Sequence, residues 1–182
     1  AFSDSASFSY SKGKIVDEAT KRSFDFQKGN LHGRHNAENV MVALAVADEL
    51  GLSWDDVGGS LEEFSPPPHR CEKVAEIEGI VFINDSKSTN LHSLQSALAG
   101  EENPVVLIVG GKEKGLDFTE LNDLVAERVK AAVCIGEIAE KIASLWSKVT
   151  TCVVAADLVE AVAQTLSLAE RGEVVLFSPG TS

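Results

Sequence analysis

Apolar and polar positions follow two different patterns along the chain, and the change comes at the run of prolines Pro66–Pro68. Before it, the stretches ASFSY, KIVDE and SFDFQ alternate apolar with polar residues, which predicts a small antiparallel meander. The segment HNAENVMVALAVADELG follows. It is apolar on nearly every side from Val40 to Ala47, so we expect a buried helix that ends at Gly51. Ser53 and Asp56 then have capping-box spacing, which marks the start of a second helix.

Ser65–Pro68 is the predicted domain boundary, because successive prolines exclude a helix and disfavour a central strand. Beyond it, CEKVAEIEGIVFIND predicts two strands joined through Glu78–Gly79. Apolar runs at VFIND, VVLIVG, AAVCIG, CVVAA and VVLFS then alternate with amphipathic segments. The predicted helices cover residues 86–99, 117–129, 137–146 and 157–170.

The alternation of strands and helices predicts the fold of the second half. Parallel neighbours need crossover connections, so residues 66–182 are expected to form a Rossmann-like, mostly parallel six-stranded sheet with helices on both faces. The Cys71–Ile77 strand would be an antiparallel edge. Residues 1–65 offer only short strands and two helices, one of them apolar all round. We interpret them as an incomplete α/β piece of a larger domain.

Composition excludes several kinds of function. A net charge of −12 argues against binding to nucleic acid or to an anionic membrane, since both need basic surface. No apolar segment approaches the roughly 18 residues of a membrane span. The N-terminus AFSDSASFSY lacks the features of a signal peptide and an initiator Met, so we expect a fragment of a longer protein. Three cysteines, an odd number without zinc-knuckle spacing, fit a reducing cytoplasm as its location. Cys134 and Cys152 sit in apolar runs and are predicted to be buried structural thiols, while Cys71 is too distant to complete a zinc knuckle.

Candidate chemistry gathers where strands end. In an open parallel sheet, ligands bind beyond the carboxyl ends of the strands. These ends here carry NDSKSTN, GGKEKGLD and SPGTS, which should lie along one edge of the sheet. Lys112 and Lys114 offer positive charge to a phosphate or carboxylate, although neither Walker nor G-x-G-x-x-G spacing is present. Asp85 is suited to a ribose, and Lys87 near a helix N-terminus would reinforce anion binding.

Each of these motifs also has a simpler interpretation. A hydroxyl of NDSKSTN, from Ser86, Ser88 or Thr89, would cap the following helix. Asn36 and Asn39 lie on one face at the start of a helix, where an Asn cap is equally plausible. Arg70, just after the prolines, suits an interdomain salt bridge as well as a ligand contact. No catalytic triad or metal-ligand cluster is evident in the sequence.

The motifs occur in a specific order: GRHNAEN, HRCE, NDSKSTN, GGKEKG and SPG. In this order they resemble the Mur ligases, the ATP-dependent amide-bond-forming enzymes of peptidoglycan synthesis. NDSKSTN followed by GGKEKGLDF is the specific part, and the resemblance covers Leu31 to Ser182. Within the family, the pattern is most similar to the branch that adds D-glutamate to UDP-N-acetylmuramoyl-L-alanine.

The resemblance implies a domain organisation. Residues 1–65 would be the C-terminal part of the central ATP-binding domain, and residues 66–182 the C-terminal Rossmann-like domain, truncated at its end. The P-loop, the magnesium-binding acidic residues and a carbamylated lysine would then lie upstream of Ala1. ATP and Mg²⁺ would accordingly belong to the full-length enzyme, which we expect to be monomeric. The fragment itself is expected to be inactive and to bind neither ATP nor Mg²⁺ tightly.

The resemblance also implies roles for single residues. ATP contacts are implied for Asn36, Asn39, Arg70 and Asp85. Lys87 would lie at the reaction centre as the catalytic residue, and Thr89 and Lys114 would hold the carboxylates of D-glutamate. Many relatives have an Asp where this chain has Lys112. The family's terminal motif continues past SPGTS into a segment that also binds D-glutamate.

Two alternatives remain open at this point. Another Mur ligase or a folylpolyglutamate synthetase would share the scaffold and use a different amino acid, but the D-N-P-R type motif of the diaminopimelate- or lysine-adding relatives is absent. A non-catalytic Rossmann-like binding module would need no lysines at the mouth of the sheet.

Overall fold

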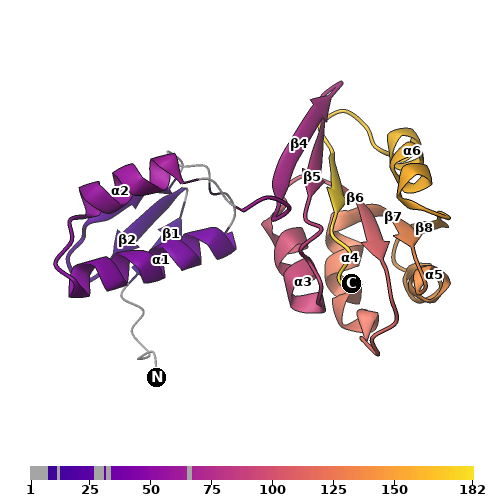
Figure 1. The fold of residues 1–182 in the computed structure, drawn as a ribbon, viewed down its shortest axis with the longest axis horizontal. Helices are drawn as coiled ribbons and strands as arrows, with labels where there is room; N and C mark the ends of the chain where they lie inside the picture. The colour runs from indigo at the N-terminus through magenta and orange to yellow at the C-terminus, as the bar shows by residue number, and fades with distance from the viewer. Residues whose placement is uncertain (1–7, 12, 27–30, 32–33, 65–66) are drawn as a thin grey trace. The chain divides into compact units, whose positions relative to one another are not determined.

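The computed structural model describes residues 8–11, 13–26, 31, 34–64 and 67–182. It divides the chain into two compact units, Ala1–Pro66 and Pro67–Ser182 (Figure 1). Each unit has its own strands, helices and buried core, so each is described by itself. The assignment of the first unit to a central ATP-binding domain stays a prediction.

The first unit contains the predicted meander. Its strands are β1 (Phe8–Ser11), β2 (Lys14–Asp17) and β3 (Ser23–Asp25), which pair antiparallel in the order β1-β2-β3. Two helices follow, α1 (Arg34–Glu49) and α2 (Trp54–Glu63). The predicted cap of the second helix is confirmed, because Ser53 accepts a hydrogen bond from the backbone N–H of Asp56 at 3.1 Å.

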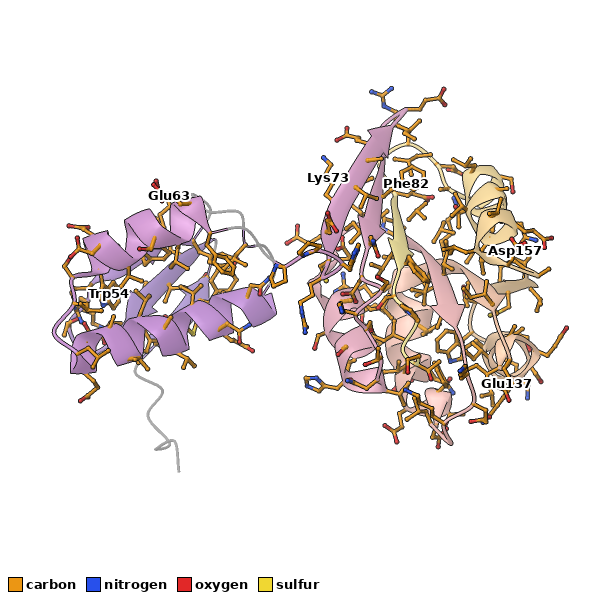
Figure 2. All side chains as sticks on the ribbon, in the orientation of Figure 1. Trp54, Glu63, Lys73, Phe82, Glu137 and Asp157 are labelled. Atoms are coloured by element: carbon orange, nitrogen blue, oxygen red, sulfur yellow. The ribbon has the colours of Figure 1, made fainter. Side chains whose placement is uncertain are left out.

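One expectation for α1 is wrong within this unit. The helix buries only one face, which includes Val40 and Leu44 and packs with Ile15 of β2. Val42 and Val46 on the other side are 54% and 52% exposed. A sheet covers only one face of a helix. In the described part of the unit, no further layer covers the opposite face of α1, which carries Val42 and Val46. Trp54, at the start of α2 (Figure 2), belongs to the same core. Its ring stacks on the ring of Phe8.

The second unit confirms the predicted sheet. Its strand order is β4-β5-β9-β6-β7-β8, and every neighbouring pair is parallel except β4 and β5. The strands are β4 (Glu72–Ile77), β5 (Ile80–Asn84), β6 (Val105–Gly110), β7 (Val129–Ile135), β8 (Thr151–Val154) and β9 (Val174–Phe177). The predicted turn between β4 and β5 has positive φ at both Glu78 and Gly79, as a tight two-residue hairpin requires.

Helices cover both faces of this sheet (Figure 1). One face packs against α3 (Leu91–Gly100), α4 (Asn122–Arg128) with its preceding 3₁₀ turn η2 (Phe118–Leu121), and α5 (Ala139–Trp146). The opposite face packs against α6 (Leu158–Leu168). The central strand β6 is buried along its whole length, as expected of a parallel strand between two helical layers. No helix among the described residues is long and apolar enough to cross a membrane.

Gly110, the last residue of β6, is a conformational requirement of this fold. Its φ of 122° lies in a region that side chains rarely adopt, and a Cβ placed there would lie 2.2 Å from the carbonyl oxygen of Ile135. That oxygen belongs to the backbone of the neighbouring strand β7, so it cannot move away as a flexible side chain would. The turn from β6 into the following loop therefore depends on glycine.

We expect Gly110→Ala to destabilise the second unit by at least about 2 kcal/mol, since the new Cβ meets backbone at an incompatible φ. Gly100→Ala is the matched control, because no atom lies within 4 Å of a Cβ at this position at the end of α3. It should change stability by no more than about 1 kcal/mol, and in the favourable direction. Urea unfolding followed by circular dichroism measures both. Equal midpoints for the two variants would contradict the steric account.

Candidate functional site

The loop after β5 is organised by the carboxylate of Asp85. This side chain is buried, with 6% of its surface exposed. One carboxylate oxygen accepts a hydrogen bond from the backbone N–H of Cys71 at 3.1 Å, and the other accepts one from the Ser178 hydroxyl at 2.8 Å. The backbone N–H of Asp85 donates to Phe177 at 2.7 Å. A buried charge is tolerated only with such partners, so Asp85 holds three segments together.

The segment that follows the prolines lies against this loop. The backbone carbonyl of His69 accepts a hydrogen bond from the backbone N–H of Lys87 at 3.1 Å. The Nδ1 atom of the His69 ring lies 3.0 Å from the side-chain amide nitrogen of Asn84. His69 and Cys71 both have positive φ, at 68° and 44°. Arg70 lies between these two residues and is exposed. Its position at the edge of the loop follows from the hydrogen bonds that hold His69 to Lys87 and Cys71 to Asp85.

The loop after β6 is shaped by glycines and by Glu113. Gly111 has a φ of 149° and lies close to Thr181, whose methyl carbon would be 3.2 Å from a Cβ at this position. Glu113 accepts hydrogen bonds from Lys141 of α5 and from the backbone N–H of Gly115, both at 2.7 Å. The hydrogen bond from Lys141 is the main cause that lowers the pKa of Glu113, so this carboxylate stays charged. The hydrogen bond between Glu113 and Lys141 therefore holds the loop to α5.

The residues after β9 join the two loops. The backbone N–H of Gly180 donates to the carbonyl of Ser88 at 2.9 Å, and the Thr181 hydroxyl donates to the carbonyl of Lys112 at 2.9 Å. The ammonium of Lys114 donates to the hydroxyl of Ser182. The three polar loops expected at one edge of the sheet therefore do lie together.

The structure brings most of the predicted site residues to this edge. Lys87, Thr89 and Lys114 are exposed on the two loops, and Arg70 and Asp85 lie beside them. Asn36 and Asn39 belong to α1 of the first unit, where Asn36 is half-buried and Asn39 is exposed. The functional roles of all seven residues stay predictions. Over the described ranges of the chain, no group of three or more His, Cys, Asp or Glu side chains is arranged to hold a metal ion.

The expected helix cap in NDSKSTN is wrong. No hydroxyl of the motif caps α3, which begins at Leu91 rather than near residue 86. Asn90 is the cap, and its side-chain oxygen accepts from the backbone N–H of Ser93 at 2.9 Å. The preceding residues instead turn back to contact the strand ends, and the Ser88 hydroxyl is buried without a hydrogen-bond partner in the structure.

Sequence reasoning did not find the roles of Ser178 and Thr181, which are 0% and 1% exposed. The SPGTS segment was singled out as a polar strand end, but nothing in its composition says that its hydroxyls point inward to the two other loops. The cysteine prediction was correct for Cys134, which is buried, whereas Cys152 is half-buried.

A family model described as "Mur ligase, glutamate ligase domain" matches residues 69–180, which include the NDSKSTN and GGKEKG loops and the terminal segment as far as Gly180. The chain belongs to the Mur ligase family. The matched region contains every strand of the six-stranded sheet, so the family assignment and the fold concern the same residues.

Three curated relatives with similar sequences carry the same name. Proteins named UDP-N-acetylmuramoylalanine–D-glutamate ligase from Desulfitobacterium hafniense, Chlorobium limicola and Aquifex aeolicus are 44%, 42% and 41% identical to this chain. The alignments cover 92%, 86% and 88% of the chain but only 36%, 34% and 39% of those proteins. The chain therefore spans about a third of the length of the curated relatives it matches.

Solved structures of Mur ligases and related enzymes share the fold. UDP-N-acetylmuramate–alanine ligase from Thermotoga maritima has a TM-score of 0.71 at 16% identity, over 96% of this chain and 41% of that one. A bifunctional folylpolyglutamate synthase/dihydrofolate synthase from Yersinia pestis has a TM-score of 0.66 at 20% identity, over 96% and 42%. At these identities the likeness concerns the fold alone.

Two buried serines of this Mur ligase site allow a direct comparison. Ser178→Ala leaves an oxygen of the buried Asp85 carboxylate without its donor, and we expect a loss of about 1.5–3 kcal/mol in stability. Ser88→Ala removes a buried hydroxyl that lacks a partner, so it should be neutral or stabilising. Urea unfolding of the two variants beside the wild type measures the difference. A destabilised Ser88→Ala variant would show that this hydroxyl has a partner in solution.

The reactivity of the Cys71 thiol should depend on pH in an unusual way. The residue is exposed, but desolvation and, next, the Asp85 carboxylate raise the pKa of its thiol to about 12. Because only the thiolate reacts, we expect alkylation by iodoacetamide at pH 8 to be at least about tenfold slower than for a free thiol. The rate should still rise between pH 9 and 10, where a free thiol levels off. A Cys71→Ser variant gives the background, and a plateau near pH 9 would contradict the raised pKa.

Proposed function

We propose that this chain is part of an ATP-dependent ligase that adds D-glutamate to UDP-N-acetylmuramoyl-L-alanine in cytoplasmic peptidoglycan precursor synthesis. The observation that carries the proposal is the identity of 41–44% to proteins named as this ligase, over nearly the whole chain. The two lysine-bearing loops at one edge of the sheet support it. Since the chain spans about a third of those relatives, the proposal concerns the longer enzyme.

The amide-forming chemistry suits the residues of the two loops. ATP would phosphorylate the muramoyl-L-alanine carboxylate, and the amine of D-glutamate would attack the acyl phosphate, releasing phosphate as the amide bond forms. A dicarboxylate amino acid needs cations and hydroxyls that bind its two acidic groups, and Lys114 and Thr89 are exposed on neighbouring loops for this role. Lys87, beside Asp85, would offset negative charge that develops at the reacting phosphate.

The nucleotide contacts assigned to this chain are Asn36, Asn39, Arg70 and Asp85. The carboxylate of Asp85 suits a ribose, because each of its oxygens accepts one hydrogen bond from the protein and keeps a lone pair for another. Arg70 is an exposed cation on the segment beside it. Mg²⁺ would be held by other residues of the longer enzyme.

The test is a ligase assay on the full-length protein that contains this chain. We expect phosphate release that requires ATP, UDP-N-acetylmuramoyl-L-alanine and D-glutamate together. Lys114→Ala should raise the KM for D-glutamate at least about tenfold, because a charge-assisted hydrogen bond to a carboxylate is lost. Lys87→Ala should lower kcat by about a hundredfold, as expected when a group that stabilises transition-state charge is removed.

Lys148→Ala is the matched control, since this exposed lysine precedes β8 at the opposite, amino edge of the sheet. Its kinetic constants should equal those of the wild type. Turnover with another amino acid in place of D-glutamate would assign a different acceptor within the same scaffold. Unchanged activity in both the Lys87 and Lys114 variants would favour a role of this domain outside catalysis.

A further inference from the structure

The short segment after β9 lies between the two loops that carry the proposed substrate contacts. Strand β9 sits between β5 and β6 in the sheet, and β5 and β6 lead into the NDSKSTN and GGKEKG loops. The residues that follow β9, Ser178–Thr181, are therefore flanked by one loop on each side. All four of these residues are buried.

Backbone hydrogen bonds fix the path of this segment without any side chain. The N–H of Ser178 donates to Ile108 at 3.1 Å, the N–H of Gly110 donates to Pro179 at 3.1 Å, and the N–H of Gly180 donates to Ser88 at 2.9 Å. Because these bonds involve only backbone groups, we expect the segment to keep its course when one of its hydroxyls is removed.

The two hydroxyls of the segment point to different loops. Ser178 donates to the carboxylate of Asp85, which belongs to the nucleotide side of the proposed site. Thr181 donates to the carbonyl of Lys112, two residues before Lys114 on the D-glutamate side. Among the described residues, the Ser178 hydroxyl makes no hydrogen bond to the GGKEKG loop and the Thr181 hydroxyl makes none to the NDSKSTN loop, so each one acts on one loop only.

We propose that Ser178 and Thr181 are separate positioning residues for the two substrates, Ser178 for ATP through Asp85 and Thr181 for D-glutamate through the Lys112–Lys114 loop. Neither residue touches the substrate in this account. Each holds the group or loop that does, and the backbone of the segment keeps the two loops in register. The inference rests on the proposed ligase function and deepens it by dividing the terminal segment between the two substrates.

The test measures the KM for ATP and for D-glutamate separately in the full-length ligase. Ser178→Ala should raise the KM for ATP about fivefold or more, which corresponds to one lost hydrogen bond, and leave the KM for D-glutamate within about twofold. Thr181→Val, which keeps the shape of the side chain, should do the reverse. Thr181→Ser keeps the hydroxyl and should restore the KM for D-glutamate.

Thr165→Val is the control for the loss of a buried hydroxyl elsewhere. Thr165 of α6 is 0% exposed and donates to the carbonyl of Val162 at 2.7 Å, so its loss costs stability without touching either loop. We expect both KM values to stay at the wild-type level in this variant. If the Ser178 and Thr181 variants raise both KM values equally, or leave both KM values at the wild-type level as expected for Thr165→Val, the two residues are structural and the inference is wrong.

Different results would overturn the proposed ligase function and the division of Ser178 and Thr181 between the two substrates. A wild-type enzyme that forms no D-glutamate amide overturns the proposed function, and the division between the two substrates falls with it. An active wild type whose variants show no split between the two KM values overturns the division alone. Hydrogen exchange at the backbone N–H of Cys71 tests the division without measuring turnover, since this N–H and the Ser178 hydroxyl donate to the same carboxylate.

The exchange rate of the Cys71 N–H should be faster in Ser178→Ala and unchanged in Thr181→Val. Equal exchange rates in the two variants would contradict separate action of the two hydroxyls.

Discussion

A buried carboxylate must find hydrogen-bond donors, and Asp85 finds them in parts of the chain that are far apart in sequence. One donor, Cys71, lies 14 residues before it, and the other, Ser178, lies 93 residues after it. Leaving a buried charge without partners costs far more than most single contacts contribute, so the three segments have to meet whenever the domain is folded. The placement of Arg70, Lys87 and the terminal segment follows from that meeting.

Sheet topology makes the meeting possible. The last strand of the described chain, β9, inserts between β5 and β6 rather than adding to an edge. In a parallel sheet all carboxyl ends share one side, so the end of β9 lies between the ends of its two neighbours. The NDSKSTN and GGKEKG loops follow strands that are not neighbours in the sheet. The segment after β9 connects these two loops through backbone and side-chain hydrogen bonds.

The fold alone does not determine which reaction a domain supports. Solved proteins named as an alanine ligase and as a folylpolyglutamate synthase share the fold of this chain at 16% and 20% identity. In folds that host many functions, the functional residues generally lie on loops positioned by a rigid scaffold. Lys112 lies in one of the loops of this site, and the Thr181 hydroxyl donates to its backbone carbonyl, so the contact is independent of the side chain at that position.

The sequence by itself determined the elements, the six-stranded sheet with its antiparallel edge, and the three polar loops, because periodicity and turn residues are local signals. It also pointed to Asp85, Lys87 and Lys114 through their motifs. It predicted the cap of α3 wrongly, since hydroxyl and amide caps look alike until the path of the loop is known. It overstated the burial of α1, because burial depends on which other layers are present. Only the tertiary structure decided that Ser178 and Thr181 face two different loops, since strand order brings together residues whose separation leaves no local trace.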